Sequence, residues 1–422
     1  MSRVFALVDC NNFYVACEQL FRPDLRHAPV LVLSNNDGCV VSRSKEAKAL
    51  GIGMAVPVFQ LREQIRRHRI VTFSSNYALY ADLSARVMQT LEQLAPAVDV
   101  YSIDEAFVDL TGVAAVRALE DFGRELRQTV QRCIGLTVCV GIAPSKTLAK
   151  LANQAAKQYP ATGGVVDLSD PRRRRRLLAL MPVGEVWGVG RRLRERLLVE
   201  GIETALQLAE ADVTDIRQRY SVQLARTVCE LNGESCQPLE DLPSPRQQII
   251  CSRSFARKIS TQAAMKTALC HYLARAAERL RGEALSAKMV TVFMRTSSFG
   301  GVGRGYANSA SASLSVPSSD TRDLMALTVM LLQRLWRQGY DYSKAGVMLT
   351  DLYPQRGQQQ DLFVSGSEPQ SQALMTTIDR INASGKSRVF FAGQGCDPSW
   401  RMRQAHLSPA YTTRWSDLPV VR

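Results

Sequence analysis

Short apolar runs separated by polar residues mark the first part of the chain. Residues 5–8 form one such run, which ends at Asp9, and the runs 98–103 and 106–110 flank an Asp-Glu pair. Runs of this kind are typical of β-strands, and the last two favour a hairpin with the acidic pair at its tip. An acidic turn on its own is usually only a solvated turn, so a second observation is needed before the pair indicates chemistry.

Helical periodicity separates these strands. Apolar residues at positions 79, 83, 87, 91 and 94 place a core-facing stripe on a helix over residues 77–94. A helical segment over 12–18 follows the first strand, and a helix over 113–133 and a strand over 136–142 follow the hairpin. This βαββαβ order predicts a ferredoxin-like sheet in an α+β multidomain protein, with residues 23–74 as an insertion.

The predicted topology brings three carboxylates together. A right-handed crossover makes the first two strands parallel, so the end of the first strand and the tip of the hairpin lie at the same edge of the sheet. Asp9, Asp104 and Glu105 would converge there. Three carboxylates at one point repel each other unless cations neutralise them, and hard oxygen ligands with room for phosphate favour Mg²⁺. A pair of such ions can clamp an in-line phosphoryl displacement.

Basic residues occur on two helical segments of this region. A short helix over residues 44–50 carries Lys45 and Lys48, which share a face because they are three positions apart. Arg43 lies beside this helix. The basic residues there could hold a triphosphate, and a solvated helix face is the alternative. Ser145 caps a second helix that runs to Lys157.

The middle of the chain contains a glycine turn between helices. Five consecutive arginines at 172–176 open a helix, and the sequence VWGVG, which contains Gly188 and Gly190, precedes a basic helix over 191–199. The turn resembles a helix-hairpin-helix, in which exposed N–H groups at a helix start bind DNA phosphates. A GxG turn alone is a weak signal, and its basic surroundings strengthen it.

The region after residue 245 predicts a separate basic domain. Between Arg246 and Arg304 there are eleven Lys or Arg residues and two acids, a net charge of +9 in a chain whose formal charge is +14. Such a concentration of charge indicates a polyanionic partner. The expected strands are 249–254, 289–295, 310–314 and 345–349, and the expected helices are 261–280 and 321–337.

Length and cysteine usage narrow the class of protein. At 422 residues the chain is too long for one ordinary core, so we expect three to five domains. The ten cysteines show no CxxC pair, and the four histidines lack partners at metal-ligand spacing. Buried thiols in a reducing cytoplasm therefore explain them better than zinc or disulfides. No apolar run approaches the length of a membrane span, so we expect a cytoplasmic protein without a membrane partner.

Several motifs resemble those of the Y-family of translesion DNA polymerases, and the resemblance covers nearly the whole chain. They are VDCNNFY at residues 8–14, SIDE at 102–105 and the helix-hairpin-helix. The UmuC-type branch, which contains the catalytic subunits of DNA polymerase V, is indicated by SNNDGCV at 34–40, IICSRSF at 249–255, FAGQG at 391–395 and LSPAYTTR at 407–414.

The resemblance implies roles for individual residues and bounds for the domains. Most family members have Tyr and Arg where this chain has Lys45 and Lys48, and lysine lacks the fork of arginine. The implied sites are metal binding by Asp9, Asp104, Glu105 and the backbone carbonyl of Cys10; a steric gate against ribose at Tyr14; nucleotide contacts from Lys45, Lys48 and Lys157; DNA contacts from Gly188, Gly190, Arg253 and Arg257; and a sliding-clamp motif with Gln359, Leu362 and Phe363. The implied domains are a palm (1–22 and 75–167), fingers (23–74), a thumb (168–242), a little finger (246–350) and a C-terminal tail (351–422).

The sequence thus predicts an error-prone, template-directed DNA polymerase for translesion synthesis in the SOS response. It would use two Mg²⁺ ions, with dNTPs as substrates. Two alternatives stay open at this point: a nucleotidyl cyclase, which can share the sheet and the two-metal site, and a non-catalytic DNA-binding repair adaptor. The partners that the resemblance implies are primed DNA, a processed UmuD-like dimer, a RecA filament and the β sliding clamp.

Overall fold

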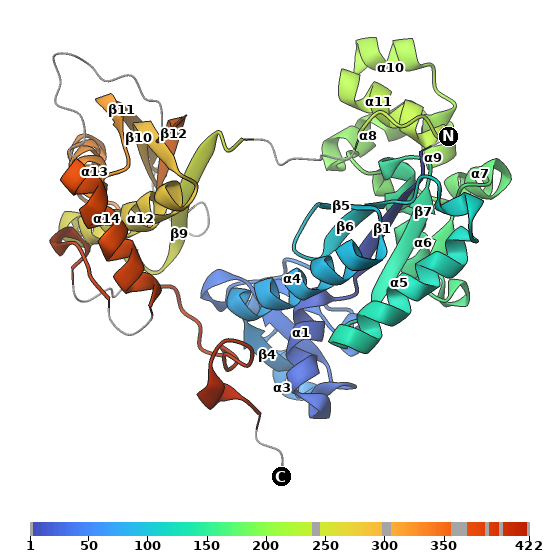
Figure 1. The fold of residues 1–422 in the computed structure, drawn as a ribbon, viewed down its shortest axis with the longest axis horizontal. Helices are drawn as coiled ribbons and strands as arrows, with labels where there is room; N and C mark the ends of the chain where they lie inside the picture. The colour runs from blue at the N-terminus through green and yellow to red at the C-terminus, as the bar shows by residue number, and fades with distance from the viewer. Residues whose placement is uncertain are drawn as a thin grey trace. The chain divides into compact units, whose positions relative to one another are not determined.

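The chain forms two compact units in the computed structural model (Figure 1). The first unit contains residues 1–34, 38–243 and 406–422, and the second contains residues 35–37 and 244–405. The structure describes residues 3–238, 245–297, 305–355, 369–384, 388–395 and 400–419.

A five-stranded sheet forms the palm, at the centre of the first unit, in the order β5–β6–β1–β7–β8. β1 pairs antiparallel with both β6 and β7, and β7 pairs parallel with β8. β1 and β7 are buried along their whole length, as expected for apolar strands that are covered on both faces. The strands are β1 Phe5–Cys10, β5 Ala97–Val100, β6 Glu105–Asp109, β7 Val138–Ala143 and β8 Val165–Asp167.

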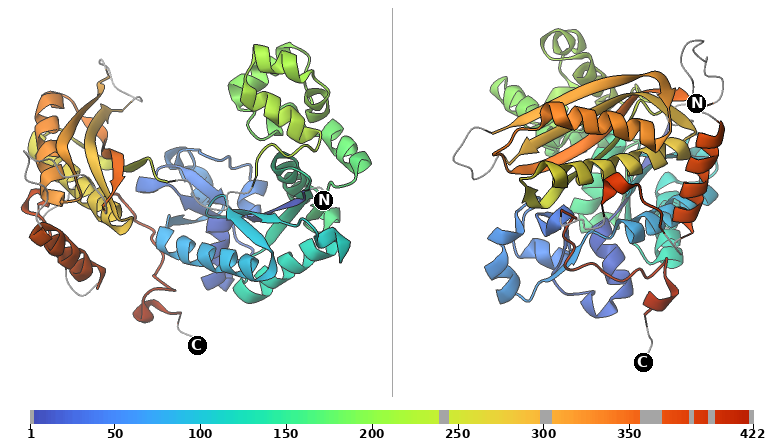
Figure 2. Two further views of the ribbon diagram at one scale, coloured as in Figure 1. Left: turned by 45° about the horizontal axis from the view of Figure 1, so that its top comes forward. Right: turned by 90° about the vertical axis from the view of Figure 1, so that its left-hand side faces the viewer.

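Helices cover both faces of the palm sheet (Figure 2). α1, α4 and α5 share a core with Ala6 and Val8 of β1, whereas α6 packs on the opposite face with Leu7. Gly141 permits the close approach of α6, because a Cβ there would lie 2.1 Å from the backbone nitrogen of Asn153. The helices are α1 Phe13–Phe21, α4 Tyr77–Leu94, α5 Leu119–Ile134 and α6 Lys146–Gln158.

The order of these elements confirms the predicted ferredoxin-like βαββαβ sheet, with β8 added at one edge. α4 spans the predicted residues 77–94. The helix predicted from residue 113 is shorter, because α5 begins only at Leu119, after a 3₁₀ turn over Val113–Ala115. Residues 114–118 are exposed and bury no helix face against the core, and packing of such a face supplies most of a helix's stability.

The fingers are inserted between α1 and α4 and form a three-stranded sheet in the order β3–β2–β4. β2 pairs antiparallel with β3 and parallel with β4, and its residues Leu31 and Leu33 form a small core with Ala47. Ser44 caps α2 by accepting a hydrogen bond from the N–H of Ala47 at 3.2 Å. The elements are β2 Val30–Leu33, β3 Val40–Arg43, α2 Lys45–Ala49, α3 Arg62–Arg67 and β4 Val71–Ser74.

The thumb consists of helices that share a core with α6. Asp170 caps the helix that contains the five arginines. Gly188 adopts a positive φ of 92°, which suits glycine, and Gly190 is the N-cap of α8. The helices are α7 Pro171–Leu180, α8 Arg191–Val199, α9 Ala205–Ala209, α10 Val213–Arg219 and α11 Val222–Leu231.

The second unit contains the little finger, a four-stranded antiparallel sheet in the order β11–β10–β12–β9, packed against α12 and α13. Its strands are longer than predicted. In β11, for example, Ser and Ala dominate and many side chains are exposed, so an apolar pattern marks only part of the strand. The elements are β9 Gln248–Ile259, α12 Gln262–Gly282, β10 Leu285–Thr296, β11 Ala307–Ser318, α13 Thr321–Leu335, β12 Tyr342–Pro354 and α14 Pro369–Ala383.

The last described residues return to the first unit. Tyr411 joins the palm core and stacks on Phe21 of α1, with ring centroids 4.6 Å apart and planes 8° apart. The expected C-terminal tail is therefore divided between the two units. Across the described parts of the chain, no helix is both long enough and apolar enough to cross a membrane.

Candidate active site

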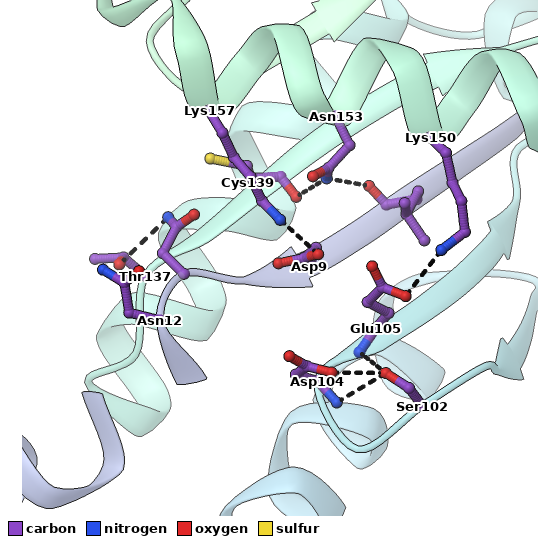
Figure 3. A network of polar contacts seen from close by, with 12 residues as sticks. Asp9, Asn12, Ser102, Asp104, Glu105, Thr137, Cys139, Lys150, Asn153 and Lys157 are labelled. Carbon is purple, nitrogen blue, oxygen red and sulfur yellow. Dashed lines mark hydrogen bonds and ion pairs between the residues drawn. The ribbon is translucent and has the colours of Figure 1, made fainter. Parts of the chain in front are cut away.

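Asp9 and Glu105 occupy facing positions in the palm sheet (Figure 3). The antiparallel register of β1 and β6 pairs them directly, and it places Leu7 opposite Phe107 in the same way. Leu7 and Phe107 pack in the core that contains α6. Because side chains alternate along a strand, Asp9 and Glu105 point to that same side of the sheet. Strand alternation thus brings two carboxylates together beneath α6.

Ser102 shapes the hairpin tip that carries Asp104. Its hydroxyl donates to Asp104 Oδ1 at 2.7 Å, and its Oγ accepts from the N–H groups of Asp104 at 3.3 Å and Glu105 at 3.1 Å. The N–H of Cys10 donates to the carbonyl of Asp104 at 2.9 Å, which joins the end of β1 to the tip. The three predicted acids therefore lie at one edge of the sheet.

One face of α6 supplies a lysine to each of the two paired carboxylates. Lys157 Nζ lies 2.6 Å from Asp9 Oδ2, and Lys150 Nζ lies 2.9 Å from Glu105 Oε2. Asn153, between them on the same face, donates to the carbonyls of Leu7 and Cys139 and so fixes α6 to the sheet. The spacing of 150, 153 and 157 is the helical repeat that keeps these side chains aligned.

Burial raises the pKa of Asp9 to about 7, although the ammonium of Lys157 pulls the pKa down. Burial also acts to raise the pKa of Glu105, but hydrogen bonds with Asp9 and Lys150 outweigh it and hold that pKa below its usual value. Two buried negative charges that face each other are costly, which is why each of these carboxylates has an ammonium group beside it.

The donor set at this edge suits a hard divalent cation. Carboxylate oxygens from Asp9, Asp104 and Glu105, with the backbone carbonyl of Cys10, are the oxygen ligands that Mg²⁺ prefers. In the described parts of the chain, no three His, Cys, Asp or Glu side chains are already gathered as a metal site. The ammonium groups of Lys157 and Lys150 instead supply the positive charge that a cation would bring.

A cavity of about 390 Å³ opens beside these acids, between the palm and the fingers. Lys48 is among the residues around it and donates to Asn12 Oδ1. Lys45, the other predicted nucleotide lysine, is exposed and is not part of this lining. The lining is formed by Asp9, Cys10, Asn12, Phe13, Tyr14, Val41, Ser42, Arg43, Lys48, Met54, Asp104 and Lys157.

Tyr14 borders this cavity and is held by other rings. It stacks on Tyr80 with centroids 4.5 Å apart and planes 15° apart, and it meets Tyr77 edge-on at 6.0 Å. Phe13 beside it is buried in the palm core. The two neighbouring aromatic residues therefore differ in environment, and only Tyr14 is both supported from behind and partly open to the cavity.

The remaining predicted DNA and clamp residues lie in other parts of the chain. Gly188 and Gly190 form the turn before α8. Arg257 is exposed on β9, whereas Arg253 is only partly exposed and lines a cavity with Tyr272 and other residues of α12. Arg253 thus lies on the helix-covered side of its strand. The predicted clamp motif, with Gln359, Leu362 and Phe363, lies outside the described residues.

Four polar residues of this site were not assigned from the sequence. Ser102, two positions before Asp104, has the spacing of a turn-forming serine. Lys150 lies seven positions before Lys157 and so on the same helix face. Asn12, with a positive φ of 50°, gave no such signal, because its position depends on the insertion of the fingers. Arg43, which donates to the carbonyl of Ile52 at 2.6 Å, is marked in the sequence only as one of the basic residues beside the helix over 44–50.

Comparison with known proteins identifies the family. Residues 8–154 match the impB/mucB/samB family, residues 246–362 match its C-terminal domain, and residues 372–421 match a domain of unknown function. Protein ImpB of Salmonella typhimurium is 52% identical over 99% of this chain and 100% of its own length. Protein UmuC of the same species is 51% identical over the same shares of the two chains.

More distant matches are DNA polymerases. DNA polymerase IV of Corynebacterium diphtheriae is 30% identical over 79% of this chain and 72% of its own length. Among solved structures, a Y-family DNA polymerase chimera of Dbh and Dpo4 superimposes with a TM-score of 0.65 at 21% identity, over 82% of this chain and 98% of the chimera. A DNA polymerase is therefore favoured over the cyclase and the adaptor. The chain belongs to the impB/mucB/samB family and is a UmuC-type translesion DNA polymerase of the Y-family.

Proposed function

We propose that this polymerase extends a primer across damaged template bases by two-metal nucleotidyl transfer at the edge of the palm sheet. The observation that carries the proposal is the pairing of Asp9 with Glu105, next to Asp104 and the cavity that Tyr14 borders. The primer 3′-OH would attack the α-phosphate of the dNTP, and pyrophosphate would leave. Bound Mg²⁺ would neutralise the phosphate charge and activate the attacking oxygen.

The residues of the chain bind and orient the reactants in this scheme. Asp9, Asp104, Glu105 and the carbonyl of Cys10 would hold the metal ions. Lys157 would exchange its contact with Asp9 for one with the triphosphate, because the metal then neutralises that carboxylate. Most of the rate enhancement in such chemistry comes from positioning and charge neutralisation.

The nucleotide pocket would select the sugar and hold the phosphates. The ring of Tyr14 would lie under the sugar of the incoming nucleotide, where a 2′-OH would clash with it. Lys48, which borders the cavity, is the better candidate for a phosphate contact than Lys45, which is not part of the cavity lining. A lysine can act there as a point charge without the planar fork of arginine.

Primed DNA would be held by the thumb and the little finger. The N–H groups at the start of α8, after Gly188 and Gly190, suit phosphate oxygens. Arg257 and its basic neighbours suit the DNA backbone, which determines affinity more than sequence preference.

The proposed cellular role and partner proteins rest on the resemblance to UmuC-type subunits. The enzyme would act in the cytoplasm during the SOS response, with a processed UmuD-like dimer, a RecA filament and the β sliding clamp through residues 359–363. The test is primer extension on a damaged template with Mg²⁺ and dNTPs, with and without these partners. Template-dependent extension supports the proposal; formation of cyclic nucleotide without a template, or DNA binding without synthesis, would contradict it.

A further inference from the structure

The segment 406–411, within the domain of unknown function, lies along α1 and α4 of the first unit. The N–H of Ser74 donates to the carbonyl of His406 at 2.9 Å, and the N–H of His406 donates to Ser74 Oγ at 3.0 Å. At the other end of the segment, Tyr411 stacks on Phe21. Both ends of the segment are therefore fixed by specific contacts.

Ser408, between these two anchors, reaches a buried carboxylate. Its Oγ accepts from Asn76 Nδ2 at 2.9 Å, and its hydroxyl donates to Glu18 Oε1 at 3.1 Å. Asn76 also caps α4 by accepting from the N–H of Leu79 at 3.3 Å. One serine of the C-terminal segment thus joins the start of α4 to a side chain of α1.

Glu18 connects this serine to the tyrosine that borders the nucleotide cavity. It is fully buried, and the hydroxyl of Tyr80 donates to its Oε1 at 2.6 Å. The ring of Tyr80, which is also fully buried, stacks on Tyr14. Tyr14 and Glu18 are one helical turn apart on α1, so the contacts Ser408–Glu18–Tyr80–Tyr14 form one continuous path.

The energetics of Glu18 make this path sensitive to the loss of a single bond. A buried carboxylate needs hydrogen bonds to offset the loss of its hydration. Its second oxygen, Oε2, has no hydrogen-bond partner among the described residues. Loss of the Ser408 hydroxyl would leave Tyr80 as the remaining donor to Oε1, so Glu18 would shift to find another partner and Tyr80 would shift with it.

We propose that residues 406–411 form a strap that positions Tyr14 through Ser408, Glu18 and Tyr80, and that the strap thereby sets discrimination between deoxyribonucleotides and ribonucleotides. This inference rests on the proposed role of Tyr14 as the steric gate. Ser408, Glu18 and Tyr80 are positioning residues, because these three side chains would act on the substrate only through Tyr14.

The test compares kcat/KM for a dNTP and for the matching rNTP in the full chain with its partners. Ser408→Ala and Tyr80→Phe each remove one hydroxyl, and each should lower the dNTP/rNTP ratio about fivefold, the scale of one hydrogen bond. The double variant should lower it no further than the larger single effect, because both changes break the same path. Ser408→Thr keeps the hydroxyl and should restore the parent ratio.

Two reference variants separate the possible outcomes. Ser416→Ala removes an exposed hydroxyl five residues beyond the strap and should leave the ratio unchanged. Tyr14→Ala should lower the ratio more than any strap variant; if it does not, the gate proposal fails and the strap inference fails with it. A different outcome would overturn the inference. If Tyr14→Ala lowers the dNTP/rNTP ratio, but Ser408→Ala and Tyr80→Phe lower kcat/KM for the dNTP and for the rNTP equally, the strap is only structural. Tyr80→Phe keeps the stacked ring, so it decides the question even if Ser408→Ala does not fold.

Discussion

Asp9 and Glu105 face each other across the pairing of β1 and β6, and α6 places a lysine on each. Without metal, the two ammonium groups offset negative charge on the two paired carboxylates. A divalent cation bound to these acids would take over the contacts that the lysines now make. The same lysines would then be available to phosphate, so metal binding would favour nucleotide binding.

The first prediction concerns Asp104, at the hairpin tip. Asp104→Asn keeps the shape and removes one negative charge from the proposed metal site. We expect primer extension to fall by about 100-fold or more, the scale on which removal of one transition-state contact acts. Affinity for primed DNA, measured by fluorescence anisotropy, should be largely kept. Asp121→Asn, at an exposed position on α5, is the matched control, and parent-like extension by Asp104→Asn would refute the site.

The second prediction separates the two lysines of α2. Both lysines are exposed, but only Lys48 is part of the cavity lining. Lys48→Ala should raise KM for dNTPs about tenfold, the scale of a hydrogen bond to a charged group, and Lys45→Ala should change it little. Steady-state kinetics at fixed primer concentration measure this difference. Equal effects of the two substitutions would mean that the cavity does not receive the triphosphate.

Much of this site could be predicted from the sequence because strand alternation and topology determine it. The apolar run before Asp9 and the β-rich runs around Asp104 and Glu105 were sufficient to place three acids at one edge. The pairing of Lys150 with Glu105 was not predicted, because helical spacing shows which residues share a face but not which strand lies below it. The contact of Ser408 with Glu18 was not predicted either, since 390 residues separate them and no periodicity marks the segment.

The third prediction compares two arginines of β9. If the basic domain follows the DNA backbone, affinity should fall with salt by about 0.9 log units per log unit of salt for each phosphate neutralised. Arg257→Ala removes an exposed charge and should reduce that slope by about one phosphate contact. Arg253→Ala should reduce it less, because Arg253 lies toward α12. Binding titrations between 50 and 200 mM salt, roughly the range in which such contacts weaken, measure the slopes.

A larger effect of Arg253→Ala than of Arg257→Ala would reverse this assignment. An affinity that does not depend on salt would contradict the DNA-binding role of the whole little finger.

The fourth prediction concerns Leu362 and Phe363, which follow a run of glutamines. Replacing both with Ala should abolish stimulation of synthesis by the sliding clamp, because a peptide anchor would lose two apolar side chains worth roughly 1.5 to 3 kcal/mol each. Basal synthesis without the clamp and the melting temperature should stay nearly the same. A clear drop in melting temperature, or stimulation that survives, would indicate that the pair packs against its own domain.

The last prediction concerns pH and Glu18. Burial raises the pKa of Glu18, and the hydrogen bonds from Tyr80 and Ser408 only partly oppose that rise. In the unfolded chain the pKa of Glu18 is near 4.5. Below that pH, Glu18 holds a proton in the folded and in the unfolded protein, so it causes no loss of stability. As the pH rises from there through the folded pKa, the unfolded chain releases its proton first, so the free energy of unfolding falls.

Glu18→Gln removes this titration and keeps an oxygen that can accept from Tyr80 and Ser408. The melting temperature of the variant minus that of the parent should therefore increase as the pH rises above about 4.5, and differential scanning calorimetry at several pH values measures it. Glu203→Gln, at an exposed position in the same unit, is the matched control and should follow the parent at every pH. A difference that stays constant, or that falls as the pH rises, would mean that Glu18 is held as an anion in the folded protein. The path from Ser408 to Tyr14 would then depend on charge as well as on hydrogen bonding.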